Sequence, residues 1–112
     1  MGKVSQDFDF EARPLEANEE LEAVAWAENN GWMTRKIQYQ GRHSCPDRLF
    51  AGHGHLLLIE MKKRGKTRSR DGKLSKGQEE EFKRYAAVGV PIPVFYTAAD
   101  VIAFLQSKML LV

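Results

Sequence analysis

The sequence predicts a single α/β domain in which a mixed sheet is flanked by helices, in the order α-β-β-β-α-β-α. Three observations support this prediction. Residues 55–62, His-Leu-Leu-Leu-Ile-Glu-Met-Lys, are apolar on both faces, which is typical of a central strand. Helical patterns with start and stop signals lie on both sides of this run. A length of 112 residues leaves room for one domain.

The first predicted helix covers about residues 16–30, where Ala, Leu and Glu dominate. Leu21, Val24 and Ala25 share one face at helical spacing, and we expect that face to meet the core. Gly31 follows Asn29 and Asn30 and provides the stop signal, because glycine readily adopts the left-handed conformation after a helix.

The later elements also have local signals. Gly52-His53-Gly54 predicts a tight hairpin turn between two strands. Ser75 and Gln78 have the spacing of a capping box, which opens a helix. The predicted order after the first helix is strands over 32–40, 47–51 and 55–62, a helix to about residue 88, a strand over 93–96, and a final helix that starts near Thr97.

Composition limits the class of protein. The chain is 43% hydrophobic and 29% charged, as in ordinary globular proteins, and no apolar run is long enough to span a membrane. Residues 1–14 lack periodicity, so we expect an N-terminal arm there and a single domain over 15–112. The N-terminus does not resemble a signal peptide, and Cys45 is the only cysteine, so we expect a reducing cytoplasm.

Charge is unevenly distributed although the net charge is only +2. Residues 62–76 contain eight bases and a single acid, Asp71. Such a run is often only a solvated loop, and its Gly, Ser and Thr content favours a mobile one. The run directly follows the strand predicted over residues 55–62, which carries Glu60 and Lys62, the candidate site residues described next. We therefore predict that the run binds the backbone of a nucleic acid. The predicted nucleic-acid-binding residues are Lys63, Arg64, Lys66, Arg68, Arg70, Lys73 and Lys76.

Asp47 and Glu60 are candidate metal ligands. They lie on strands joined by the predicted hairpin turn, so their carboxylates can converge, and close carboxylates repel unless a cation lies between them. Oxygen ligands of this kind select Mg²⁺ or Mn²⁺, and the backbone carbonyl of Met61 can add a further ligand. Lys62 shares a strand face with Glu60, while Met61 points to the opposite face. Lys62 can therefore act on an attacking water and stabilise charge on a phosphate.

Simpler readings remain open. Asp47 can be a turn aspartate, and Glu60 and Lys62 an exposed ion pair. A zinc site is a weaker alternative, because the spacing of its candidate ligands is not a standard zinc pattern. Those candidates are His43, Cys45, His53 and His55.

Three segments together resemble the VRR-NUC branch of the PD-(D/E)xK nuclease superfamily. They are Gly41 to Pro46–Asp47, Leu57-Leu-Ile-Glu-Met-Lys62, and Leu74-Ser-Lys-Gly-Gln78. The resemblance extends from about Glu20 to Val94 and implies a restriction-endonuclease-like fold. One departure is that the family's glycine lies two residues before the proline. Here Ser44 occupies that place and Gly41 lies five residues before Pro46.

The resemblance also implies roles for further residues. It implies a glutamate from the first helix in the site, for which Glu19, Glu20 and Glu22 are candidates. Glu20 is preferred because it lies one turn before Val24, and it would reach a metal directly or through water. The resemblance further implies that Gln78 supports catalysis, which is compatible with its capping role.

Stand-alone members of this branch are associated with phage genomes, with branched or junction DNA, and with a homodimeric layout. We therefore expect a metal-dependent deoxyribonuclease that acts as a homodimer, in the host cytoplasm if the chain is phage-encoded. RNA cleavage by the same site is a weaker possibility. The competing hypothesis is a non-catalytic nucleic-acid-binding module that uses residues 63–76, with the carboxylates in structural roles.

Overall fold

The computed structural model describes residues 15–109, so the predicted arm over residues 1–14 lies outside the described residues. Four strands form one sheet in the order β1-β2-β3-β4. Strands β1, β2 and β3 are antiparallel neighbours, and β4 joins β3 in parallel, so the sheet is mixed. The strands are β1 Met33–Lys36, β2 Arg48–Gly52, β3 His55–Met61 and β4 Val94–Phe95.

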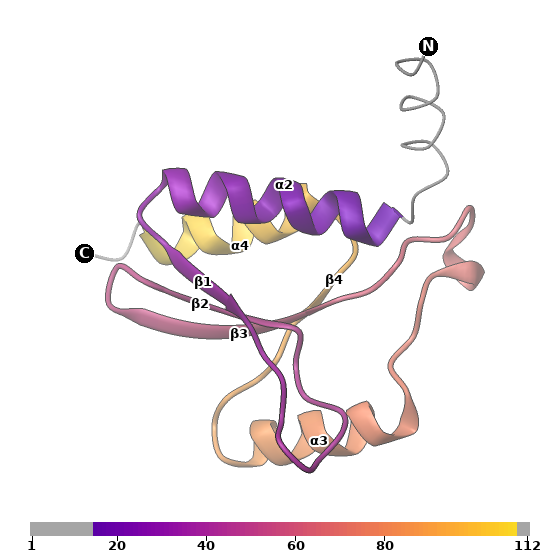
Figure 1. The fold of residues 1–112 in the computed structure, drawn as a ribbon. Coiled ribbons are helices and arrows are strands. Elements are labelled where there is room, and N and C mark those ends of the chain that lie inside the picture. Colours follow the sequence, from indigo (N-terminus) through magenta and orange to yellow (C-terminus); the bar gives the residue numbers. More distant parts are fainter. Residues whose placement is uncertain (1–14, 110–112) are drawn as a thin grey trace.

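Helices lie on both sides of this sheet (Figure 1). Helix α2 (Leu15–Asn29) and helix α4 (Ala98–Met109) lie together on one face, and helix α3 (Lys76–Ala87) lies beyond the other. The predicted α/β class and the order α-β-β-β-α-β-α are therefore confirmed. Between residues 15 and 109, no helix combines the length and the apolar character needed to cross a membrane.

Strand β1 ends at Lys36, four residues earlier than predicted. The chain leaves the sheet there as a loop, residues 37–47, whose two ends are joined by a hydrogen bond from Ile37 N to Asp47 O at 3.0 Å. Two loop residues have positive φ, Gly41 at 76° and Ser44 at 73°. The loop therefore returns the chain to the sheet just before β2, and this return places Asp47 at the N-terminal end of that strand.

The hydrophobic core lies between the sheet and the α2–α4 pair. Its largest fully buried side chains include Phe50, Ile59 and Leu105. The face of α2 that meets this core was predicted wrongly: Leu21 is 59% exposed, whereas Ala23 and Ala27 are buried. Alanines spaced four apart form a small-residue stripe, and α4 packs closely against α2 because that stripe admits a near approach.

Candidate active site

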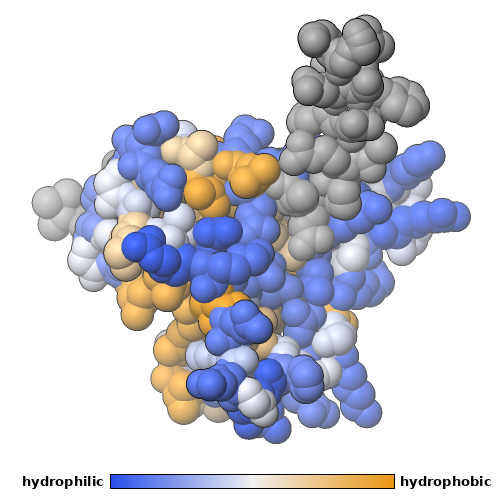
Figure 2. All heavy atoms as spheres, viewed as in Figure 1, coloured by the Kyte–Doolittle hydropathy of each residue, from blue (hydrophilic) through white to orange (hydrophobic). Residues whose placement is uncertain are grey.

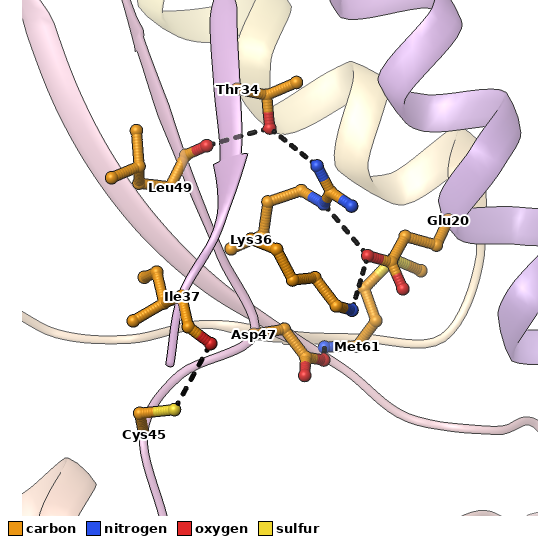
Figure 3. Close-up of polar contacts among 9 residues, drawn as sticks. Glu20, Thr34, Lys36, Ile37, Cys45, Asp47, Leu49 and Met61 are labelled. Carbon is orange, nitrogen blue, oxygen red and sulfur yellow. Dashed lines mark hydrogen bonds and ion pairs between the residues drawn. The ribbon is translucent and has the colours of Figure 1, made fainter. Parts of the chain in front are cut away.

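Asp47 is directed toward the end of β3 by an irregularity in the β2–β3 pairing. Its backbone N donates to Ile59 O at 3.1 Å, although Ile59 is the register partner of Arg48. A one-residue offset of this kind is typical of a β-bulge, which re-aims a side chain at a strand end. The Asp47 carboxylate accepts a hydrogen bond from Met61 N at 2.8 Å (Figure 3). One carboxylate oxygen is thus fixed beside the backbone of the predicted catalytic strand.

Glu60 is the most deeply buried charged residue of the site, at 2% exposure for the whole residue. Its Oε2 accepts a hydrogen bond from Gln78 Nε2 at 2.9 Å and lies 3.4 Å from Lys62 Nζ. Its Oε1 is buried and has no hydrogen-bond partner among the described residues. A bound cation would satisfy this oxygen, since a buried polar atom without a partner is costly.

The electrostatics of Glu60 also favour a bound cation. Burial and the negative charge of Asp47 raise the pKa of the Glu60 carboxyl to about 7, although Lys62 and Gln78 partly offset the rise. Two carboxylates with one nearby ammonium leave an excess of negative charge. The donor set therefore fits a hard divalent cation bound through carboxylate oxygens.

Alternation along β3 puts Lys62 on the same face as Glu60. Met61 lies between them and is 1% exposed in the core on the opposite face, as the period of a strand requires. The side chain of Lys62 is 21% exposed, whereas that of Glu60 is 3% exposed. The Lys62 ammonium is therefore closer to solvent than the Glu60 carboxylate, which is buried. This differs from the alternative in which Glu60 and Lys62 form an exposed ion pair.

Gln78 has the expected capping role and also contacts Glu60. The capping box is present, because the Ser75 side chain accepts from Gln78 N at 3.1 Å and Gln78 Oε1 accepts from Ser75 N at 3.1 Å. The remaining amide nitrogen of Gln78 donates to Glu60. The start of α3 thus fixes the orientation of the Glu60 carboxylate.

Glu20 lies on the α2 side of the sheet and forms ion pairs with two basic side chains there. Its Oε2 accepts hydrogen bonds from Lys36 Nζ and Arg48 Nε, each at 2.9 Å (Figure 3). Burial alone would raise the pKa of Glu20, but the bonds and charges of Lys36 and Arg48 outweigh it, and the pKa is lowered. In the structure Glu20 is thus an ionised partner of Lys36 and Arg48, and its role as a metal ligand stays a prediction.

The other two candidates on this helix have different surroundings. Glu19 Oε1 accepts a hydrogen bond from Ala98 N at 2.6 Å, so this carboxylate caps the start of α4. Glu22 is exposed. Of the three glutamates, Glu20 is the one held against the sheet strand that follows Asp47.

Within residues 15–109, no three or more His, Cys, Asp or Glu side chains are grouped so that they could hold a metal ion. Asp47, Glu60 and Glu20 are thus not grouped as one cluster here, and the predicted ligand set of these three residues with the Met61 carbonyl stays a prediction. The zinc alternative gains no support, since Cys45 Sγ contacts Ile37 O at 3.5 Å and His53 Nε2 contacts Asn30 O at 2.9 Å.

The basic segment projects from the end of β3 and leads to the start of α3 (Figure 1). It contains a short 3-10 helix, Arg68–Arg70, and its base is closed by Gly72 N donating to Lys63 O at 2.7 Å. Asp71 accepts from Gly65 N at 2.8 Å, and Tyr96 donates to Gly72 O at 3.0 Å. Hydrogen bonds therefore close the base of the segment, and its mobility stays a prediction.

The surface of this projection is predominantly hydrophilic (Figure 2). The side chain of Arg68 lies outside what the structure describes. The other predicted nucleic-acid-binding residues, Lys63, Arg64, Lys66, Arg70, Lys73 and Lys76, are all exposed.

Sequence reasoning missed a polar cluster that joins the 37–47 loop to α3. Glu81, which is 8% exposed, accepts hydrogen bonds from Tyr39 and Arg42 of the loop. The available signal was helical spacing: Glu81 lies three residues after Gln78 and so shares its helix face.

The fold defines the class as a small α/β domain with a mixed four-stranded sheet and helices on both faces. A solved structure described as a "VRR_NUC domain" is similar to this chain, with a TM-score of 0.70 and 25% identity over 84% of this chain and 97% of that one. Comparisons with models of known protein families and with curated proteins find no match. Over most of its length the chain is therefore similar in fold to a VRR-NUC domain, in agreement with the resemblance of its motifs.

Proposed function

We propose that this protein is a divalent-metal-dependent deoxyribonuclease that hydrolyses phosphodiester bonds at Asp47, Glu60 and Lys62. The observation that carries the proposal is the buried, unpartnered Oε1 of Glu60 near the negative charge of Asp47. Asp47, Glu60 and the Met61 carbonyl would hold Mg²⁺ or Mn²⁺. When bound, such an ion acts as a Lewis acid that favours deprotonation of water and offsets charge on the phosphate.

Gln78 and Lys62 would have the remaining roles in the proposed site. Gln78 fixes Glu60 Oε2, so that Oε1 stays free to bind the cation. Lys62 is close enough to Glu60 to be held in place and exposed enough to meet substrate. Its ammonium would orient the attacking water and stabilise charge as the new bond to phosphorus forms and the bond to the leaving oxygen breaks.

Branched or junction DNA is the proposed preferred substrate, and the test compares it with duplex and single-stranded DNA. Purified protein is incubated with each substrate in Mn²⁺, in Mg²⁺ and with a chelator. The proposal expects cleavage that needs a divalent ion. Binding without cleavage under every divalent ion would favour the non-catalytic nucleic-acid-binding module.

The exposed basic segment supports DNA as the partner, and salt dependence tests its role. Changing Lys66 and Lys73 to glutamine should lower the slope of log affinity against log salt for duplex DNA by about 1.8, since each phosphate contact contributes about 0.9. The same change at Lys83 and Lys108, outside the segment, should leave the slope unaltered. Equal slopes for wild type and the Lys66/Lys73 variant would contradict the proposal that the basic segment contacts DNA phosphates.

An apolar surface supports the homodimer as the proposed assembly. Leu56 is 67% exposed, and it borders a groove of about 410 Å³ lined by Leu58, Val90, Ile92 and Phe104 among others. Exposed apolar patches of this kind commonly mark interfaces. Light scattering should give twice the chain mass of 12.8 kDa, and Leu56→Glu should halve it, whereas Leu21→Glu on α2 should not. A monomeric wild type would contradict the dimer.

A further inference from the structure

Helix α3 contacts both elements that carry the candidate metal ligands. Gln78 binds Glu60 of β3, and one turn later Glu81 binds the 37–47 loop, whose last residue is Asp47. Residues three apart on a helix lie on the same face, so one face of α3 meets both elements.

Glu81 is the acceptor at the centre of the second contact. The Tyr39 hydroxyl donates to Glu81 Oε2 at 2.5 Å, and Arg42 and Arg84 donate to Oε1 at 3.1 Å and 3.2 Å. The Tyr39 hydroxyl also lies 2.8 Å from the Tyr85 hydroxyl. Tyr39, Arg42 and Arg84 thus contact the Glu81 carboxylate, and Tyr39 also contacts Tyr85.

The protonation states make this contact strong. The hydrogen bond from Tyr39 and the nearby arginines lower the pKa of Glu81 despite its burial. Burial and the bond to Glu81 raise the pKa of the Tyr39 hydroxyl. The carboxylate is therefore ionised and the hydroxyl keeps its proton, which gives a charge-assisted hydrogen bond.

The loop can transmit this anchoring to Asp47 because its ends are tied together. Ile37 N donates to Asp47 O at 3.0 Å, and Cys45 Sγ contacts Ile37 O at 3.5 Å. Apolar packing adds little to the docking of α3, since Phe82 is its one buried hydrophobic residue. The loop is thus joined to α3 chiefly through polar contacts.

From this arrangement we infer that Glu81 and Tyr39 are positioning residues, which hold the 37–47 loop on α3 and so set the distance between Asp47 and Glu60 for cation binding. The inference rests on the proposed metal site. It assigns to α3 the alignment of both carboxylates, one through Gln78 and the other through Glu81.

The test measures Mn²⁺ binding by electron paramagnetic resonance, without DNA, in wild type, Tyr39→Phe and Glu81→Ala. Loss of a partner that holds a metal ligand directly typically weakens metal binding about 10- to 100-fold, and we expect the lower end of that range for both variants, because they act on Asp47 through the loop. Amide hydrogen exchange in the 37–47 loop of the metal-free protein should become faster in both. Glu80→Ala, an exposed glutamate next to Glu81, is the matched control and should bind Mn²⁺ like wild type.

Tyr39→Phe removes a single hydroxyl and remains informative if Glu81→Ala does not fold. An Mn²⁺ affinity of Tyr39→Phe within twofold of wild type would overturn the positioning role alone. A wild type that binds no Mn²⁺ would overturn the proposed function and the positioning role with it. A wild type that binds Mn²⁺ but cleaves no DNA would overturn the proposed nuclease activity. The ratio of Mn²⁺ affinities between wild type and Tyr39→Phe would still decide the positioning role.

Discussion

Lys62→Ala should lower the rate of metal-dependent DNA cleavage about 100- to 1000-fold, the usual cost of removing one preorganised electrostatic group from an active site. The metal concentration at half-maximal rate should change little, because Lys62 is not a proposed ligand. DNA affinity should stay near that of wild type, because the basic segment is intact. Single-turnover cleavage and a gel-based binding assay measure the two quantities separately.

Asp47→Asn should instead weaken metal binding. The amide oxygen of asparagine can still accept the hydrogen bond from Met61 N, so the fold is retained while one ligand charge is lost. The half-saturating metal concentration should rise roughly tenfold or more, because ligand charge sets cation affinity. Lys83→Ala and Asp100→Asn, both exposed and outside the candidate metal site, are the matched controls for metal dependence. Undiminished cleavage in Lys62→Ala and Asp47→Asn would refute the site assignment.

The second large effect is a dependence of stability on pH and metal. The pKa of Glu60 is about 7 in the folded protein against 4.5 for an ordinary glutamate, so the folded state holds this proton more tightly. Its contribution is complete below about pH 4.5 and is lost as pH rises through 7, at a cost of up to about 3 kcal/mol. In a chelator, the metal-free protein should therefore melt several degrees lower at pH 8 than at pH 5.5, as about 1 kcal/mol shifts the midpoint of a small domain by several degrees.

Mn²⁺ should reverse this loss, because a cation binds the ionised carboxylate and competes with the proton. The increase in melting temperature on adding Mn²⁺ should be larger at pH 8 than at pH 5.5. Glu60→Gln is the control, since it cannot ionise and lacks a ligand charge. Glu20 and Glu81 have lowered pKa values and titrate below this window, so they contribute little to it. Identical pH profiles for wild type and Glu60→Gln would contradict the assignment.

Local sequence signals were enough to predict the frame of the candidate site. The period of two along β3 separates Glu60 and Lys62 from Met61, and the hairpin turn brings Asp47 to the same end of the sheet. The capping box at Ser75 also depends on residues three apart. These features follow from short-range geometry, which a sequence pattern records directly.

Features that depend on tertiary packing were not predicted. The pattern of α2 favoured Leu21 on the inner face, but α4 selects the small Ala23 and Ala27 instead. Tyr39 and Glu81 are 42 residues apart, and no local period relates them. The pairing of Glu20 with Lys36 and Arg48 likewise depends on how α2 crosses the sheet, so the sequence alone could not assign its partners.

The most direct test of the central claim is a crystal structure of the protein soaked in Mn²⁺, with the ion located by anomalous scattering. We predict one ion about 2.0–2.3 Å from a carboxylate oxygen of Asp47 and from Oε1 of Glu60. Manganese bound elsewhere, with both carboxylates free of metal in protein that cleaves DNA, would contradict it.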